Sequence, residues 1–135
     1  AANSEFATRP YGPEGLKRVY GVDAEITPVE DSGGPLTVEA LTKGDVDVAD
    51  IYTSSPAIDD NGLVVLQDPQ SLILPQNVVP LVSDSLDAKA VQAINAVQAA
   101  LTADELRALN KRSTGEQLDS ATIAKDWLTK QGLLA

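Results

Sequence analysis

One part of the sequence places an aromatic ring beside several hydroxyl groups. Tyr52 is followed directly by Thr53, Ser54 and Ser55, and it closes a segment in which apolar and polar residues alternate. Such alternation predicts a β-strand, and α/β sheets bind ligands at the carboxyl ends of their strands. The pattern indicates a ligand-binding site; a partly buried tyrosine followed by a turn is the alternative that the same residues allow.

Arg9 is a second candidate for binding, since it is the only Arg or Lys among the first 16 residues and precedes Pro10 in a loop. An arginine can hold a carboxylate through two parallel hydrogen bonds. An ordinary surface arginine is the alternative. Trp127 lies at helical spacing from Ile123, which favours a place in the core over a place around a ligand.

The sequence offers no catalytic constellation. It contains no Cys and no His, which removes thiolate chemistry, the commonest metal ligand and a Ser-His-Asp triad. Ser54 or Ser55 as a hydrolase nucleophile would need a base from elsewhere. The run 33–35, Gly-Gly-Pro, lacks the Gly-Lys-Ser/Thr ending of a phosphate loop. We therefore expect a protein that is not an enzyme and needs no cofactor.

Three neighbouring acids, Asp45, Asp47 and Asp50, are the nearest approach to a metal site. Strand alternation directs Asp45 and Asp47 to one face and Asp50 to the other. A calcium loop would also need a glycine and a distal glutamate at fixed spacing, and these are missing. We expect a solvated strand edge and no metal.

Composition excludes two further classes of protein. The net charge is −10, which argues against nucleic-acid binding. No run of 18 apolar residues exists to span a membrane, and the first five residues do not have the basic start and apolar run of a signal peptide. Residues 1–61 hold twelve acids against four bases. This excess indicates a solvated acidic face or a lobe that favours a cationic ligand.

Proline, glycine and capping residues mark the expected helices, and short apolar runs mark the expected strands. Helices are predicted from Pro13 to Tyr20, from Pro35 to a stop at Gly44, from Asp87 onward, from Ala103 onward, and after a cap at Asp119 or Ser120. Strands are predicted at 24–29, 46–52, 63–66 and 78–82. This order predicts an α/β protein, although four such short strands make a poor sheet by themselves.

A family resemblance rests on several motifs. Residues 44–58, GDVDVADIYTSSPAI, resemble the segment GDVDV-x-x-x-YTTDP-x-I of osmoprotectant-binding proteins. Residues 5–21 resemble the family's E-F-x-x-R-P-x-G-x-x-G-L…YG, and the two apolar runs resemble its L-V-x-L-x-D and N-V-A-P-L-V strands. The match continues through the closing helices. The chain is thus similar to the C-terminal part of a substrate-binding protein of a glycine betaine/choline-type ABC importer.

The resemblance implies a fold and a division of the chain. It implies part of a two-lobed, type II periplasmic-binding-protein-like fold whose N-terminal portion is absent. Residues 1–52 would belong to the second lobe, residues 53–62 would form the hinge, and residues 63–135 would complete the first lobe with the C-terminal helices. Missing partner strands would explain the poor sheet.

The resemblance also implies the residues that line the cleft. The family holds quaternary ammonium groups in a cage of tyrosines by cation–π attraction, and Tyr52 falls on one cage tyrosine. Thr53 would form a polar wall beside it. Arg9 falls on the arginine that clamps the ligand's carboxylate, and Phe6 is a further candidate.

Two positions depart from the family pattern. Gln76 stands where the P-P-Y-N motif carries a second cage tyrosine, and Ser55 replaces the usual Asp. Glutamine has no π face and offers a hydrogen-bonding amide instead. The cleft is therefore expected to take either a small osmoprotectant or a more polar neutral solute, such as a polyol, a sugar-like or a phenolic compound.

These implications lead to one expected function and one rival. The chain is expected to capture a small solute outside the cytoplasm, in the periplasm or lipid-anchored at the outer face of the membrane, and to deliver it to an ABC permease. The rival is a ligand-sensing module on the same fold. Apolar residues in 63–66 and 78–82 would be left uncovered, so self-association or domain swapping is also predicted.

Overall fold

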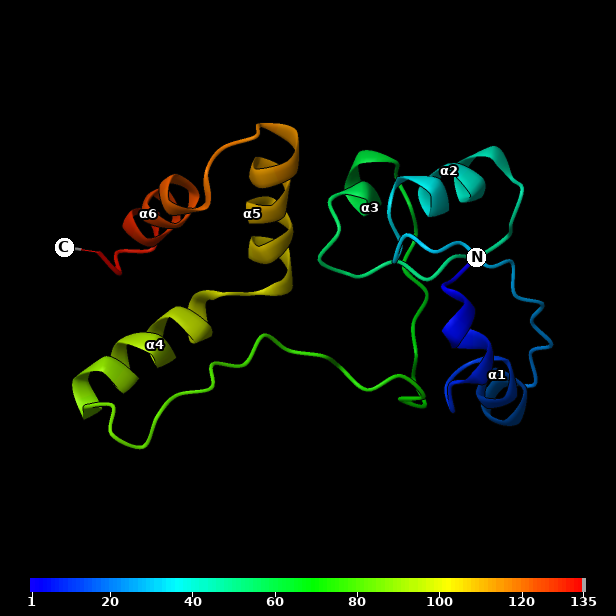
Figure 1. Ribbon diagram of the computed structural model, residues 1–135, viewed down its shortest axis with the longest axis horizontal. Helices are drawn as coiled ribbons and strands as arrows, with labels where there is room; N and C mark the ends of the chain where they lie inside the picture. The colour runs from blue at the N-terminus through cyan, green and yellow to red at the C-terminus, as the bar shows by residue number, and fades with distance from the viewer. Residues whose placement is uncertain (135) are drawn as a thin grey trace. The chain divides into compact units, whose positions relative to one another are not determined.

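A computed structural model describes residues 1–134, and helices form its regular structure (Figure 1). In chain order these are the 3₁₀ helix η1 (Ser4–Thr8) and the α-helices α1 (Pro13–Tyr20), α2 (Pro35–Lys43), α3 (Ala57–Asp60), α4 (Ala88–Ala100), α5 (Ala103–Gly115) and α6 (Ser120–Lys130). Of these, η1 and α3 were not anticipated, because both are short and lie in segments rich in turn residues.

The two N-terminal α-helices begin and end where local signals place them. α1 and α2 each start with a proline, which loses nothing at the first position because the N–H there has no helical partner. Each ends at a glycine in the left-handed region, Gly21 with φ 71° and Gly44 with φ 79°. Only glycine adopts this conformation without a steric cost, so both predicted stops are confirmed.

The three C-terminal helices are capped by side chains. Asp87, Thr102 and Asp119 each accept a hydrogen bond from the backbone amide three residues further on, at 2.9, 3.2 and 3.0 Å. This bond satisfies one of the amides that a helix leaves unpaired at its N-terminus. The predicted starts of α4, α5 and α6 are confirmed, with Asp119 rather than Ser120 as the cap of α6.

A short central segment, residues 1–3, is hydrogen-bonded to a first flanking segment, residues 27–29. The amide of Ala2 donates to the carbonyl of Thr27 at 3.3 Å, and the amide of Val29 donates to the carbonyl of Ala2 at 2.9 Å. Together these bonds form a parallel bridge between Ala2 and Pro28. Pro28 tolerates this position because the bridge does not use its missing N–H.

A second flanking segment, residues 48–50, pairs with the other side of the central segment. The amino group of Ala1 donates to the carbonyl of Val48 at 2.7 Å, and the amide of Asp50 donates to the carbonyl of Ala1 at 2.8 Å. The bonds again run in the parallel sense. The chain reaches the first flank through α1 and the second through α2. It therefore follows a β-α-β-α-β path in miniature, with its first segment in the middle.

The four strands predicted from the sequence do not form as hydrogen-bonded strands in the described part of the chain. Of these segments, only 27–29 and 48–50 pair, each through two hydrogen bonds to the central segment. Residues 63–66 and 78–82 form no ladder, and most of their apolar side chains are exposed, Leu81 completely. The prediction was wrong because alternation specifies which face a strand buries, while a ladder also requires a neighbouring segment.

The chain divides into two compact units. The first contains residues 1–53 and 57–76, and the second contains residues 54–56 with the chain from 77 onward. Each has a small core: Ala2, Val38, Ile58 and the completely buried Thr37 in the first, and Ile123 with Trp127 in the second. Trp127 is thus a core residue, as predicted.

The compact units do not coincide with the predicted lobes, because residues 57–76 associate with the N-terminal residues. The assignment of 1–52, 53–62 and 63–135 to second lobe, hinge and first lobe concerns the arrangement of a two-lobed protein, and it stays a prediction. None of the helices within residues 1–134 combines the length and apolar character needed to cross a bilayer.

The turn after η1 leads to a first testable prediction. Gly12 is buried, and a Cβ added there would lie 2.0 Å from the carbonyl oxygen of Phe6. Since the clash is with backbone, no side-chain rotation relieves it, and Gly12→Ala should lower the free energy of unfolding by about 1–3 kcal/mol. Urea unfolding followed by far-UV circular dichroism measures the change.

Gly115→Ala is the matched control for this substitution. An added Cβ at Gly115 meets nothing within 4 Å, and the residue is exposed at the end of α5. Its change in stability should stay below about 1 kcal/mol and favour the folded state. Equal destabilisation by the two substitutions would contradict the close approach at Gly12.

Candidate functional site

Arg9 is placed by a tight turn that begins at the end of the central segment. The amide of Arg9 donates to the carbonyl of Phe6 at 3.2 Å, and the amide of Gly12 donates to the carbonyl of Arg9 at 2.9 Å. The absence of a Cβ at Gly12 lets the chain come this close to Phe6. Arg9 and Phe6, two of the predicted binding residues, are therefore brought together by backbone hydrogen bonds.

The Arg9 side chain forms an ion pair with Glu5. One guanidinium nitrogen lies 2.8 Å from Glu5 Oε2, and the Arg9 side chain is 47% exposed. The Phe6 ring packs against Tyr11 instead, with ring centroids 5.9 Å apart and planes inclined by 58°. A carboxylate already stands where the resemblance places a ligand's carboxylate.

Tyr52 and Thr53 come just after the second flanking segment, with only Ile51 between. The Tyr52 side chain is 62% exposed, so its ring is available to a ligand. The backbone just before it is braced by Gly33, where an added Cβ would lie 2.8 Å from the carbonyl oxygen of Asp50 and 2.9 Å from Cα of Ile51. Tyr52 thus follows the carboxyl end of a paired parallel segment, the kind of edge where α/β sheets bind ligands, while Arg9 follows the central segment after η1.

The loop between the first flanking segment and α2 is fixed to the same edge. The Asn3 side-chain amide donates to Ser32 Oγ at 3.2 Å, and the Ser32 amide donates to Asn3 Oδ1 at 2.9 Å. The Ser4 amide donates to Glu30 Oε1 at 2.8 Å. Sequence reasoning missed these three side-chain partners, and the signal that could have found them is their position at or just after the carboxyl ends of paired segments.

The N-terminus of α2 is filled by the chain's own carboxylate. Asp31 Oδ2 accepts from the amide of Leu36 at 2.7 Å, and Oδ1 accepts from the hydroxyl of the buried Thr37 at 2.5 Å. The Thr37 hydrogen bond, with backbone donors, holds the pKa of Asp31 below its ordinary value. Asp31 thus anchors the loop that braces Tyr52, and it occupies the helix end at which an anion would otherwise bind.

Gln76 lies apart from the other predicted residues in the chain, although it belongs to the same compact unit. Its side chain is exposed at the end of the connection 67–76. Within residues 1–134, no hydrogen bond or ion pair joins it to Arg9 or Tyr52. The structure therefore groups Phe6 with Arg9 and Tyr52 with Thr53, and Gln76 belongs to neither group.

Two other possibilities from the sequence find no support in the described residues. Asp45, Asp47 and Asp50 form no cluster that could hold a metal ion, and no other such cluster occurs within residues 1–134. Ser54 contributes its backbone carbonyl to a hydrogen bond from the Asn110 side chain at 2.9 Å. This bond ties the backbone at Ser54 to α5.

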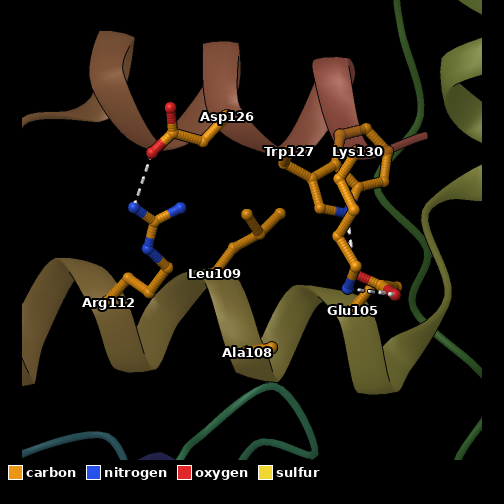
Figure 2. Close-up of a pocket in the computed structure, with 7 residues that line it drawn as sticks. All are labelled: Glu105, Ala108, Leu109, Arg112, Asp126, Trp127 and Lys130. Atoms are coloured by element: carbon orange, nitrogen blue, oxygen red, sulfur yellow. Dashed lines mark hydrogen bonds and ion pairs between the residues drawn. The ribbon is translucent and has the colours of Figure 1, made fainter. Parts of the chain in front are cut away.

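The second unit contains a cavity of about 220 Å³ between α5 and α6 (Figure 2). The polar groups in it face one another across the helices: Trp127 Nε1 donates to Glu105 Oε2 at 2.7 Å, and Arg112 pairs with Asp126 at 2.8 Å. The Asp126 hydrogen bond raises the pKa of Arg112, which stays charged. The volume is below the roughly 300–1,000 Å³ of small-molecule sites. The Trp127–Glu105 and Arg112–Asp126 contacts therefore indicate a structural link between α5 and α6, called here the lock.

A comparison with protein families identifies the chain. Residues 1–130 match the family model OpuAC, described as the substrate-binding domain of ABC-type glycine betaine transport systems. The chain belongs to the OpuAC family. The resemblance stated from the motifs is thereby confirmed, and with it the type II periplasmic-binding fold of the family.

Membership in the OpuAC family establishes a general role. The chain has a substrate-binding role in ABC import, with a small-molecule solute and an ABC permease as the family's partners. OpuAC is a family of binding proteins that act outside the cytoplasm and is not an enzyme family. The parallel segments and their crossover helices in the first unit are consistent with the α/β character of that fold.

The lock between α5 and α6 gives a second prediction. Glu105→Ala would leave the N–H of the buried Trp127 without its acceptor, which should cost about 1–3 kcal/mol. Trp127 is the only tryptophan of the chain, so a red shift of its fluorescence in native buffer and an earlier urea midpoint would both report the loss.

Lys130→Gln provides the control for this prediction. Its ammonium lies 3.8 Å from Glu105 and its side chain is largely exposed, so removing the charge should change stability by less than about 1 kcal/mol. Should Lys130→Gln cost as much as Glu105→Ala, the ion pair and not the indole hydrogen bond would hold the helices together.

Proposed function

We propose that this chain binds a small quaternary ammonium osmoprotectant, such as glycine betaine or choline, and delivers it to an ABC permease. The observation that carries the proposal is the family match over residues 1–130, whose description specifies glycine betaine transport. The exposed aromatic ring and the arginine at the carboxyl ends of the parallel segments support it. In this proposal Arg9, Tyr52, Thr53, Gln76 and Phe6 line the cleft.

Tyr52 is proposed to receive the ammonium group. A cation over a tyrosine face gains about 0.5–1 kcal/mol at exposed sites and about 2 kcal/mol or more when water is excluded. Its ring is now mostly exposed, so the larger value requires that lobe closure covers it. Closure of two lobes around a ligand is a hinge movement of the kind that binding proteins use, with residues 53–62 proposed as the hinge.

Arg9 is proposed to hold the carboxylate of a zwitterionic ligand such as glycine betaine. Its guanidinium is already paired with Glu5 at 2.8 Å, so the ligand has to share or displace that carboxylate. Because the Glu5 side chain is 65% exposed, water can take over its solvation at little cost. Choline has no carboxylate and would leave this pair intact.

Gln76 favours a second candidate ligand on the same fold. An exposed amide at a position where the family pattern carries a tyrosine can donate to and accept from hydroxyl groups. A polyol, a sugar-like or a phenolic solute would use these bonds, and it would not need a second aromatic wall. A ligand-sensing module with the same fold remains the rival role.

The third prediction tests the ligand by isothermal titration of the full-length protein with glycine betaine, choline and a panel of polyols and sugars. Glycine betaine is expected to bind, and Tyr52→Ala should weaken binding between about twofold and thirtyfold, the equivalent of one cation–π contact. Tyr52→Phe keeps the ring and should bind nearly as well. Binding of a polyol without either ammonium compound would assign Gln76, not Tyr52, as the main recognition residue.

The fourth prediction concerns the Glu5–Arg9 pair. Glu5→Gln removes the competing carboxylate, so affinity for glycine betaine should rise between about 1.4-fold and fivefold, the range expected for an exposed ion pair. Affinity for choline should not change. A weaker binding of glycine betaine by this variant would mean that Glu5 orients Arg9 and does not compete for it.

Self-association of the chain, predicted from the sequence, is also proposed. The exposed side chains of Val64, Leu66, Val79 and Leu81 offer apolar surface that a second chain would cover. Light scattering of the chain 1–135 at micromolar concentration measures it, and a strict monomer would count against it.

A further inference from the structure

Outside the proposed ligand residues, two long-range hydrogen bonds join the end of α1 to the connection formed by residues 67–76. The hydroxyl of Tyr20, the last residue of α1, donates to Asp68 Oδ1 and accepts a hydrogen bond from the Gln70 amide at 2.9 Å. These residues are 48 and 50 positions apart in the chain. The contact therefore fixes two segments that the sequence does not place together.

Asp68 organises the connection itself. Its Oδ1 also accepts from the Leu72 amide at 3.0 Å, and its Oδ2 accepts from the Ile73 amide at 2.8 Å. The Ser71 amide donates to the Asp68 carbonyl at 3.0 Å while Ser71 takes the left-handed φ of 52°. A short carboxylate that binds amides ahead of it in this way shapes a turn. The turn ends three residues before Gln76.

Packing adds to these bonds. The Leu72 side chain lies over Gly15 of α1, where an added Cβ would come within 3.0 Å of Leu72 Cδ1. The Tyr20 hydrogen bond, with the two backbone donors, lowers the pKa of Asp68 below its ordinary value. Partial burial, with the same hydrogen bond, raises the pKa of Tyr20. At neutral pH this contact, called here the Tyr20–Asp68 tie, is therefore a neutral phenol bonded to a carboxylate.

We propose that Tyr20 and Asp68 are positioning residues that hold the connection 67–76 on α1 and so fix where Gln76 meets the ligand. The inference rests on the proposed function, since it presumes that Gln76 lines the cleft. α1 itself begins four residues after Arg9, so the tie also sets Gln76 in register with the turn that carries Arg9. Neither Tyr20 nor Asp68 touches the ligand in this scheme.

The fifth prediction is a double-mutant cycle in the full-length protein, read by titration with glycine betaine. Tyr20→Phe keeps the ring but removes the hydroxyl that makes both hydrogen bonds. It should weaken binding between about twofold and tenfold. Gln76→Ala should weaken binding as well. Adding Tyr20→Phe to Gln76→Ala should weaken binding no further, because the effects of two substitutions that act through the same contact do not add.

Tyr11→Phe is the matched control for the lost hydroxyl. The Tyr11 hydroxyl makes no hydrogen bond within residues 1–134, and its ring would remain against Phe6. A Tyr20→Phe effect that persists in the Gln76→Ala protein would overturn the inference, because the tie would then act on folding and not through Gln76. Normal affinity of Tyr20→Phe or of Gln76→Ala would overturn it too.

Failure of the proposed function would look different. Wild-type protein that binds no quaternary ammonium compound would reject the ligand, and the tie would then be judged without it by amide hydrogen exchange. Tyr20→Phe should speed exchange at Gln70, Leu72 and Ile73, whose amides the tie protects. Unchanged exchange at these three amides would show that the tie does not hold the connection.

Discussion

The arrangement of the first unit depends on the pairing of residues 1–3 with a neighbour on each side. Ala2 exchanges hydrogen bonds with 27–29, and Ala1 exchanges them with 48–50. α1 and α2 are the crossovers that parallel pairing requires. The first segment of the chain lies in the middle, so the order of the segments reverses there. At such a reversal the carboxyl end of the central segment opens into the crevice in which α/β proteins bind ligands. Four hydrogen bonds thus fix the central segment between its two flanks.

Close backbone contacts connect these paired segments to the proposed binding residues. The turn that presents Arg9 closes only because Gly12 has no side chain, and the backbone before Tyr52 is braced only because Gly33 has none. Asp31 secures the loop around Gly33 through the buried Thr37. The two groups of the site thus depend on small residues and one capping carboxylate, and larger side chains at either glycine would move the binding residues without touching a ligand.

The sequence predicts the helices closely and the pairing poorly, for a physical reason. A proline at Pro13, a glycine at Gly21 or a carboxylate at Asp119 acts on amides a few residues away, so its effect can be deduced locally. Pairing of 1–3 with its flanks, and the Tyr20–Asp68 tie, join residues tens of positions apart. Alternation in the sequence specifies the faces of such segments but not their partners. Arg9 and Tyr52 were found from their residue types and positions and then matched to family motifs; Asn3 and Ser32, which carry neither signal, were not.

Charge explains why a zwitterion suits the proposed site better than a simple cation. The chain has a net charge of −10, which attracts cations in general and so discriminates little among them. Arg9 adds a local requirement, because its guanidinium is paired with Glu5. A ligand that carries an ammonium and a carboxylate can occupy Tyr52 and replace Glu5 at Arg9, and the released Glu5 returns to water at small cost since it is already largely exposed. A cation without the carboxylate gains only the first contact. In the proposed function, discrimination therefore comes from exchanging one carboxylate for another, not from the overall field.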